Sequence, residues 1–178
     1  MAELLPEKWM KGVAVTTTCL AVMTAIAASR GATCGAKTQL LTAIESSKWA
    51  YYQAKSIKQN LSETQMNGFE VEILGAVIPE QKALYEEKLK TVTQEISRYD
   101  SEKNQIKKEA EDTAALNKAV SKKGNFFSGS LVFFQIGIML SSVSALLKKK
   151  FMWILGLGFG AIAIVLLGYG LFLKPLLF

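Results

Sequence analysis

Few side chains in this sequence could do chemistry. It has no histidine, so the commonest general base and the commonest metal ligand are both missing. Cys19 and Cys34 cannot readily meet within one continuous helix, which makes an internal disulfide improbable. The glutamates and aspartates between Glu86 and Asp112 are spaced like the solvated surface of a helix. We therefore predict a protein that is not an enzyme, with no cofactor and no metal site.

The charge pattern argues against a nucleic-acid partner. The formal net charge is +6, but 14 basic and 13 acidic residues lie between Gly35 and Lys123, so the polar middle is nearly balanced. A nucleic-acid site would need basic residues gathered on one face beside aromatic residues or a reading motif, and the sequence shows neither. The basic excess lies mainly beside the apolar segments.

The longest regular pattern runs from Pro79 to Lys123. Apolar and small residues recur there at steps of three and four, a period of 3.5 kept over about five heptads, which is typical of helices that wind around one another. Polar residues within such a pattern fix register or helix number, which favours a defined assembly. We predict an oligomer seam formed by Leu89, Val92, Ile96, Tyr99, Lys103, Ile106, Ala110 and Asn117.

A second helical pattern covers about residues 37–65 and is expected to end at Asn67-Gly68. Small and apolar residues share one face of it and would let another helix approach closely: Ala43, Ser47, Ala50, Ala54, Ile57 and Leu61. We expect this helix and the one at about 79–123 to form the arms of an extramembrane hairpin, or coiled-coil stalk.

The expected tip of the hairpin, residues 67–78, is apolar. Phe69, Val71 and Ile73 alternate with glutamates, which would also suit a short strand, but a lone strand would have no partner. Apolar residues exposed on a protein surface often mark a binding site. We therefore predict a partner-binding patch that combines apolar residues of the tip with aromatic residues of the first arm: Trp49, Tyr51, Tyr52, Phe69, Val71, Ile73 and Val77. The favoured alternative for Trp49–Tyr52 is stacking over the partner helix.

Three apolar segments flank this middle region. The first, residues 9–29, has the layout of a secretory signal peptide or a retained transmembrane helix, and we favour the helix. Phe126–Leu147 and Phe151–Phe172 are long enough to cross a bilayer. We predict that four of their residues pack at contacts between transmembrane helices: Gln135, Gly137, Gly156 and Gly160. Gln135 could instead line a conduction path.

The predicted fold is an all-α membrane protein with three transmembrane helices and a helical hairpin between the first two. Its expected domains are an N-terminal transmembrane helix (1–30), the extramembrane hairpin (31–125) and a transmembrane hairpin (126–178). The positive-inside rule acts on short loops, so the turn at Lys148–Lys150 is predicted to be cytoplasmic and the stalk extracytoplasmic. Arg30, Lys122, Lys123 and Lys174 favour the opposite orientation.

The order of these features resembles that of a bacterial membrane-protein family catalogued as a domain of unknown function. The resemblance covers nearly the whole chain. It rests on two blocks, Trp49-Ala50-Tyr51-Tyr52-Gln53-Ala54-Lys55-Ser56-Ile57-Lys58 and Glu95-Ile96-Ser97-Arg98-Tyr99-Asp100-Ser101-Glu102-Lys103, and on the basic triplet between the last two spans. It implies a bacterial protein with three spans and supplies no activity, cofactor or catalytic residue.

Three functions fit these observations. The first is a non-enzymatic scaffold in the bacterial inner membrane that homo-oligomerises through its stalk and the small-residue faces of its spans. The second is an accessory subunit that docks on a larger membrane complex. The third is an oligomeric channel, which would require Gln135 to face a common wet axis. We expect the lipid bilayer and further copies of the chain as partners, and favour the scaffold.

Overall fold

The computed structural model describes residues 8–172, which form three α-helices and no strand. Helix α1 spans Lys8–Gly75, α2 spans Pro79–Leu147 and α3 spans Lys150–Phe172. Only residues 76–78 and the turn at Lys148 and Lys149 separate these helices. The all-helical class is confirmed.

Each helix contains a stretch that could cross a membrane by length and composition. Windows of 18 residues reach mean hydropathies of 1.7 in α1, 1.9 in α2 and 2.3 in α3. A bilayer core takes about 20 consecutive apolar residues, so each helix supplies enough length. The chain is therefore compatible with a multi-pass membrane protein.

The helices divide between two compact units. The hairpin unit, Leu41–Ala115, holds the later part of α1 and the earlier part of α2. The three-helix unit comprises Met1–Leu40 and Leu116–Phe178, so it holds the start of α1, the end of α2 and all of α3.

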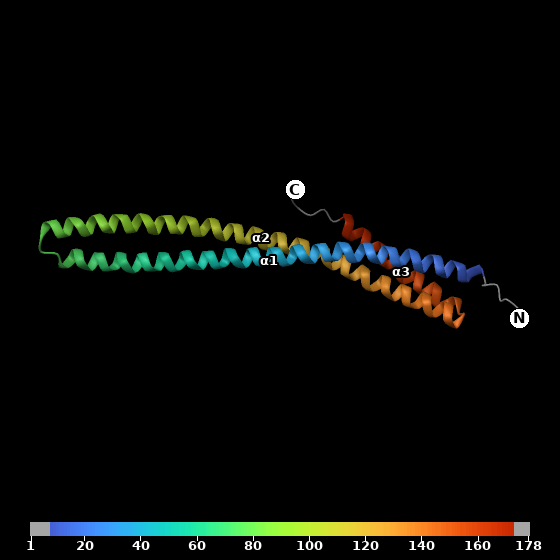
Figure 1. The fold of residues 1–178 in the computed structure, drawn as a ribbon. Helices are drawn as coiled ribbons and strands as arrows, with labels where there is room; N and C mark the ends of the chain where they lie inside the picture. The colour runs from blue at the N-terminus through green and yellow to red at the C-terminus, as the bar shows by residue number, and fades with distance from the viewer. Residues whose placement is uncertain (1–7, 173–178) are drawn as a thin grey trace. The chain divides into compact units, whose positions relative to one another are not determined.

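In the hairpin unit, α1 and α2 run side by side in opposite directions (Figure 1). The rings of Phe69 on α1 and Tyr85 on α2 have centroids 6.2 Å apart near the tip. Val92, Ile106 and Ala110 are buried along α2. They lie at positions of the predicted seam, so the 3.5-residue pattern marks the side of α2 that packs on α1.

The helix breaks expected from the sequence are absent. Helix α1 passes through Asn67-Gly68 without interruption, and residues 69–73 are helical although their alternating pattern would also suit a strand. A glycine inside a helix costs about 1 kcal/mol relative to alanine, which packing can offset. Beside Gly68, Phe69 packs against Tyr85 and thereby holds the last turns of α1 on α2.

The break expected near Gly124 is also absent, because α2 continues to Leu147. A Cβ atom at Gly124 would lie 3.2 Å from the Cβ of Cys34 on α1. This glycine therefore serves close helix packing rather than a turn.

The core of the three-helix unit draws on all three helices. A cluster of buried apolar side chains fills it: Leu20 and Ala27 from α1, Phe127 and Phe134 from α2, and Ala163 and Leu167 from α3. Phe134 and Ala163 are fully enclosed. The unit thus has a continuous core although its outer surface is apolar as well.

The turn after α2 is tightly closed. Lys148 has a φ of 54°, the left-handed conformation found just after many helix ends. The Lys149 backbone N–H donates to the Ser144 carbonyl at 3.3 Å, as expected of that motif. The Ser144 hydroxyl donates to the Lys149 carbonyl at 2.9 Å. These bonds reverse the chain between α2 and α3 over two residues.

Candidate interaction surfaces

The side of α1 that faces α2 is polar. Lys55 Nζ lies 2.5 Å from Glu102 Oε2, and Lys48 Nζ lies 3.2 Å from Glu109 Oε2. Lys103 Nζ donates to Gln59 Oε1 at 2.9 Å. Three cross-helix polar contacts therefore join the two arms.

Aromatic rings complete this polar face. The Lys55 ammonium lies 5.3 Å from the ring centroid of Tyr99, and that of Lys103 lies 5.4 Å from Tyr52. Cations within about 6 Å of an aromatic face are attracted to it. Trp49 packs edge-on against Tyr52 with centroids 5.7 Å apart. The aromatic–lysine block thus joins the helices, as the stacking alternative predicts.

The apolar side of α1 faces away from α2. Six residues form this outer face of α1, and all are exposed: Ala43, Ser47, Ala50, Ala54, Ile57 and Leu61. Ile57 is 68% exposed and Leu61 is 59% exposed. The helix that these small residues were expected to admit is therefore not α2, because ion pairs and aromatic contacts occupy the side of α1 that faces α2.

The predicted oligomer seam lies against α1 of the same chain. Val92, Ile106 and Ala110 are buried, and the other members are half-buried: Leu89, Ile96, Tyr99, Lys103 and Asn117. Contacts of Tyr99 and Lys103 with α1 residues confirm their direction. A role for these residues between copies stays a prediction, and it would require this pairing to open.

The predicted partner patch does not form one surface. Tyr52 and Phe69 contact α2 through Lys103 and Tyr85, and Trp49 and Ile73 are half-buried. Only three of its members are largely exposed, namely Tyr51, Val71 and Val77.

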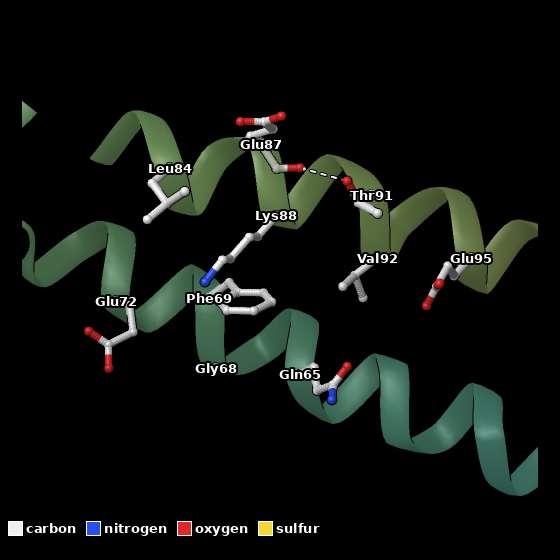
Figure 2. A pocket seen from close by; sticks show the side chains of 10 residues that line it. All are labelled: Gln65, Gly68, Phe69, Glu72, Leu84, Glu87, Lys88, Thr91, Val92 and Glu95. Carbon is white, nitrogen blue, oxygen red and sulfur yellow. Dashed lines mark hydrogen bonds between the residues drawn. The ribbon is translucent and has the colours of Figure 1, made fainter. Parts of the chain in front are cut away.

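A groove of about 740 Å³ lies between α1 and α2 near the tip (Figure 2). Figure 2 shows Lys88 reaching from α2 toward the ring of Phe69, and its ammonium lies 5.8 Å from the ring centroid. No atom lies within 4 Å of the position that a Cβ would take at Gly68, which leaves the groove open. Three carboxylates, Glu72, Glu87 and Glu95, also line it. Sequence reasoning did not predict this groove.

Three of the four residues predicted for transmembrane packing do pack together. A Cβ at Gly137 would lie 2.9 Å from the carbonyl oxygen of Gly156, so α2 and α3 touch there through backbone. A Cβ at Gly160 would lie 2.8 Å from Leu20 of α1. Gln135, however, is exposed on α2 and takes no part in this contact. Because Gln135 is exposed in the single chain, its pairing across a helix interface stays a prediction.

The ion pairs of the hairpin unit shift the pKa values of their members. The Lys55 ammonium, hydrogen-bonded to Glu102, lowers the pKa of that carboxyl below its ordinary 4.5, and Glu102 raises the pKa of Lys55 above 10.5. Hydrogen bonds from Lys48 and Gln105 lower the pKa of Glu109 in the same way. The carboxylates therefore stabilise the fold above pH 4.5, and this contribution is lost as the pH falls through their lowered pKa values.

We expect acid to loosen the arms of the hairpin. Trp49 fluorescence would report this in full-length protein carrying Trp9→Phe and Trp153→Phe. Stability of the hairpin unit should fall below pH 4.5, and the fall should be smaller in the Glu102→Gln variant, which has no charge to lose. A fall of equal size in both proteins would contradict the assignment to this ion pair. At alkaline pH, the Lys55 contribution is lost only as the pH rises above 10.5 through its raised pKa.

Within residues 8–172, no cluster of histidine, cysteine, aspartate or glutamate side chains could hold a metal ion. The fold and these surfaces define a class: an all-helical protein whose three helices are apolar enough to span a membrane. The chain belongs to the family described as Domain of unknown function (DUF4337), which matches residues 9–173. No curated protein and no solved structure matches the chain.

Proposed function

We propose that this protein is a non-enzymatic scaffold of the bacterial inner membrane that assembles with copies of itself. One observation carries the proposal: α1 meets α2 through its polar side and leaves its apolar side, the outer face of α1, exposed to solvent. An extended apolar face on a helix in water normally has a partner.

The outer face of α1 has the repeat that a second helix requires. Its six residues follow steps of four and three, the 3.5-residue period of a coiled coil. The opposite arm serves as an internal comparison, because α2 exposes no large apolar side chain between Leu84 and Val132. The apolar outer face is therefore a property of α1 and not of the stalk in general.

The charges beside the outer face of α1 are compatible with a second copy of the chain as its partner. Of the residues beside it, only Lys58 is charged, while Ser46, Gln53 and Asn60 are neutral. Lys48 and Lys55 are engaged with Glu109 and Glu102. In a symmetric pair each face meets its own copy, so a nearly uncharged face avoids repulsion between like charges.

Size decides how strong this contact can be. Residues 43–61 span about 27 Å of helix, and with a diameter near 10 Å each copy offers on the order of 300 Å². Stable soluble interfaces bury about 800 Å² per partner. The outer face alone is therefore too small for tight association. Anchoring in one bilayer would raise the local concentration of the copies and thereby strengthen their association.

Gln135 supports association between copies through their membrane-spanning segments. Its side chain is exposed in the apolar part of α2, with no hydrogen-bond partner within residues 8–172. A polar amide in hydrocarbon is costly unless it is paired, and glutamines pair across helix interfaces. The small residues Ala21, Ala25 and Ser29 on α1 are exposed too and would allow close approach of another copy.

The test is the native mass of the gently solubilised protein. We expect a discrete multiple of the 19.5 kDa chain. The double variant Ile57→Asp, Leu61→Asp should run at a smaller multiple with unchanged helix content, because it places carboxylates on the outer face of α1. Ser97→Asp, Ser101→Asp is the matched control, since both serines are exposed on α2 at the same spacing. A single chain in the wild type, or an unchanged mass in the first variant, would refute the proposal.

We further propose that the turn at Lys148–Lys150 is cytoplasmic and that the stalk is extracytoplasmic. Support comes from the two-residue turn, because short loops obey the positive-inside rule most closely. In intact cells, a membrane-impermeant thiol reagent should label a cysteine introduced by Ser101→Cys, at an exposed position of the hairpin unit, in a Cys19→Ala, Cys34→Ala background. Labelling only after lysis would reverse the orientation.

An accessory subunit is the second candidate function, and the groove near the tip favours it. Leu74 at the end of α1 and Val77 in the loop after it are 87% and 92% exposed, and the carboxylates of the groove would suit a partner with apolar and basic side chains. The same mass measurement separates the two functions. A small species that carries foreign subunits in fixed ratio, and loses them on Phe69→Ala, would favour the accessory subunit.

A further inference from the structure

The three-helix unit contains a small pocket where its helices meet. It has a volume of about 180 Å³ and draws on α1, α2 and α3. Phe127 forms its floor and is 1% exposed, and Leu171 flanks it. Gly31, Gly124 and Gly170 bring the helices close there, since Cβ atoms at these positions would lie 3.6 Å from Phe127, 3.2 Å from Cys34 and 3.0 Å from Phe127.

Cationic side chains form the rim of this pocket. Arg30 and Lys37 extend from α1 and Lys123 from α2. Within residues 8–172 none of the three makes an ion pair, in contrast to Lys48 and Lys55 in the hairpin unit. Their charges are therefore available to an anion from outside the chain.

The pocket lies where the apolar segments end. Arg30 follows the first apolar segment, Lys123 precedes the second, and Leu171 is near the end of α3. In a bilayer this is the level of the phospholipid head groups. A basic pocket between helices at that level has the chemistry of a phosphate site, and the adjoining Leu171, which is 49% exposed, offers an apolar surface to an acyl chain.

We infer that this pocket binds the phosphate head group of an anionic phospholipid, with Arg30, Lys37 and Lys123 as its anion ligands. The volume supports a head group rather than a metabolite, because sites for drug-sized molecules measure about 300–1,000 Å³. The acyl chains would remain outside, along the apolar surface of the spans. This site needs no second copy of the chain, so it stands apart from the scaffold function.

Cys34 lines the pocket and supplies a reporter. The experiment uses full-length protein with Cys19→Ala, in nanodiscs of phosphatidylcholine with or without phosphatidylglycerol. The rate at which an uncharged maleimide alkylates Cys34 is measured. We expect alkylation to be about tenfold slower with phosphatidylglycerol, because a site occupied nine-tenths of the time leaves about one-tenth of the thiol open.

The variant Arg30→Gln, Lys123→Gln should lose this protection. Each basic residue near a membrane surface contributes about 1 kcal/mol, so removing two lowers the affinity about 30-fold. Lys148→Gln, Lys150→Gln removes the same charge at the other end of the spans and should keep the protection. Native mass spectrometry gives a second readout, in which phosphatidylglycerol stays bound to the parent protein and is lost from the Arg30→Gln, Lys123→Gln variant.

Three outcomes would overturn the inference. Equal alkylation rates in the two nanodiscs would show that the pocket does not hold the lipid. Protection that persists without Arg30 and Lys123 would show that these cations do not bind it. Protection by inorganic phosphate in phosphatidylcholine nanodiscs, equal to that by phosphatidylglycerol, would assign the pocket to a free anion.

Discussion

Replacing Gly156 with alanine is expected to force α3 away from α2. The new Cβ would lie 2.8 Å from Ser141 Oγ and 2.9 Å from the Gly137 carbonyl oxygen. The carbonyl belongs to a helix backbone and cannot turn aside, so the helices themselves must separate. Overpacking of this kind costs about 1–3 kcal/mol, and we expect the upper end because backbone meets backbone.

The measurement is the thermal unfolding of the full-length protein in detergent. For a chain of this size, a loss of about 2–3 kcal/mol lowers the melting temperature by roughly 5–10 °C. Gly158 supplies the control within the same helix, because no atom lies within 4 Å of the position of its Cβ. Gly158→Ala should leave the melting temperature unchanged or raise it slightly, since alanine favours the helix. Equal melting temperatures for the two variants would be inconsistent with the close contact of α2 and α3.

Ile106→Asp is expected to open the hairpin unit. Ile106 is 8% exposed on the side of α2 that packs on α1, and Glu102 and Glu109 lie one turn away on either side. The substitution removes a buried apolar side chain and buries a carboxylate whose neighbouring lysines, Lys48 and Lys55, are already paired with Glu109 and Glu102. Together these effects should cost about 3–5 kcal/mol.

Amide hydrogen exchange in the full-length protein would detect this opening as faster exchange in residues 85–115. Ile57→Asp is the matched variant, because it makes the same change on the outer face of α1 and should leave exchange in α2 as it is. The two variants distinguish two roles for isoleucine in the hairpin unit. Ile106 joins the two arms of one chain, whereas Ile57 is proposed to join one copy to another. Exchange that accelerates equally in both variants would rule out this division.

The apolar period in the sequence marks the packed side of α2 but not that of α1. On α2 the apolar period and the buried side coincide, as Val92, Ile106 and Ala110 show. On α1 the apolar period marks the exposed side, whereas the buried side carries Lys55 and Gln59. Hydrophobic periodicity locates a face that needs a partner, but it cannot tell a partner in the same chain from one outside it.

Glycines were hard to interpret for a similar reason. In the sequence Gly68 and Gly124 both suggested helix ends, yet both lie inside helices. Gly124 lets α2 approach Cys34, while Gly68 faces open space beside the groove near the tip. A glycine that permits close approach and one that breaks a helix have the same local signal, and only the position of the neighbouring helix distinguishes them. For Gly156 and Gly160 the sequence predicted close helix packing, because glycines at this spacing in a long apolar segment are typical of contacts between transmembrane helices.

Because α1 packs through its polar side and exposes its apolar side, the hairpin unit should respond to dissolved salt in two opposite ways. The contacts Lys48–Glu109 and Lys55–Glu102 are ionic and near the surface, so dissolved salt screens them. Association through an apolar face is strengthened by salts that are excluded from protein surfaces, such as sulfate. A rising concentration of such a salt would therefore weaken the pairing of the two arms within a chain while favouring the proposed contacts of α1 with other copies. The salt concentration around the hairpin unit would then set the balance between the two kinds of pairing without any ligand.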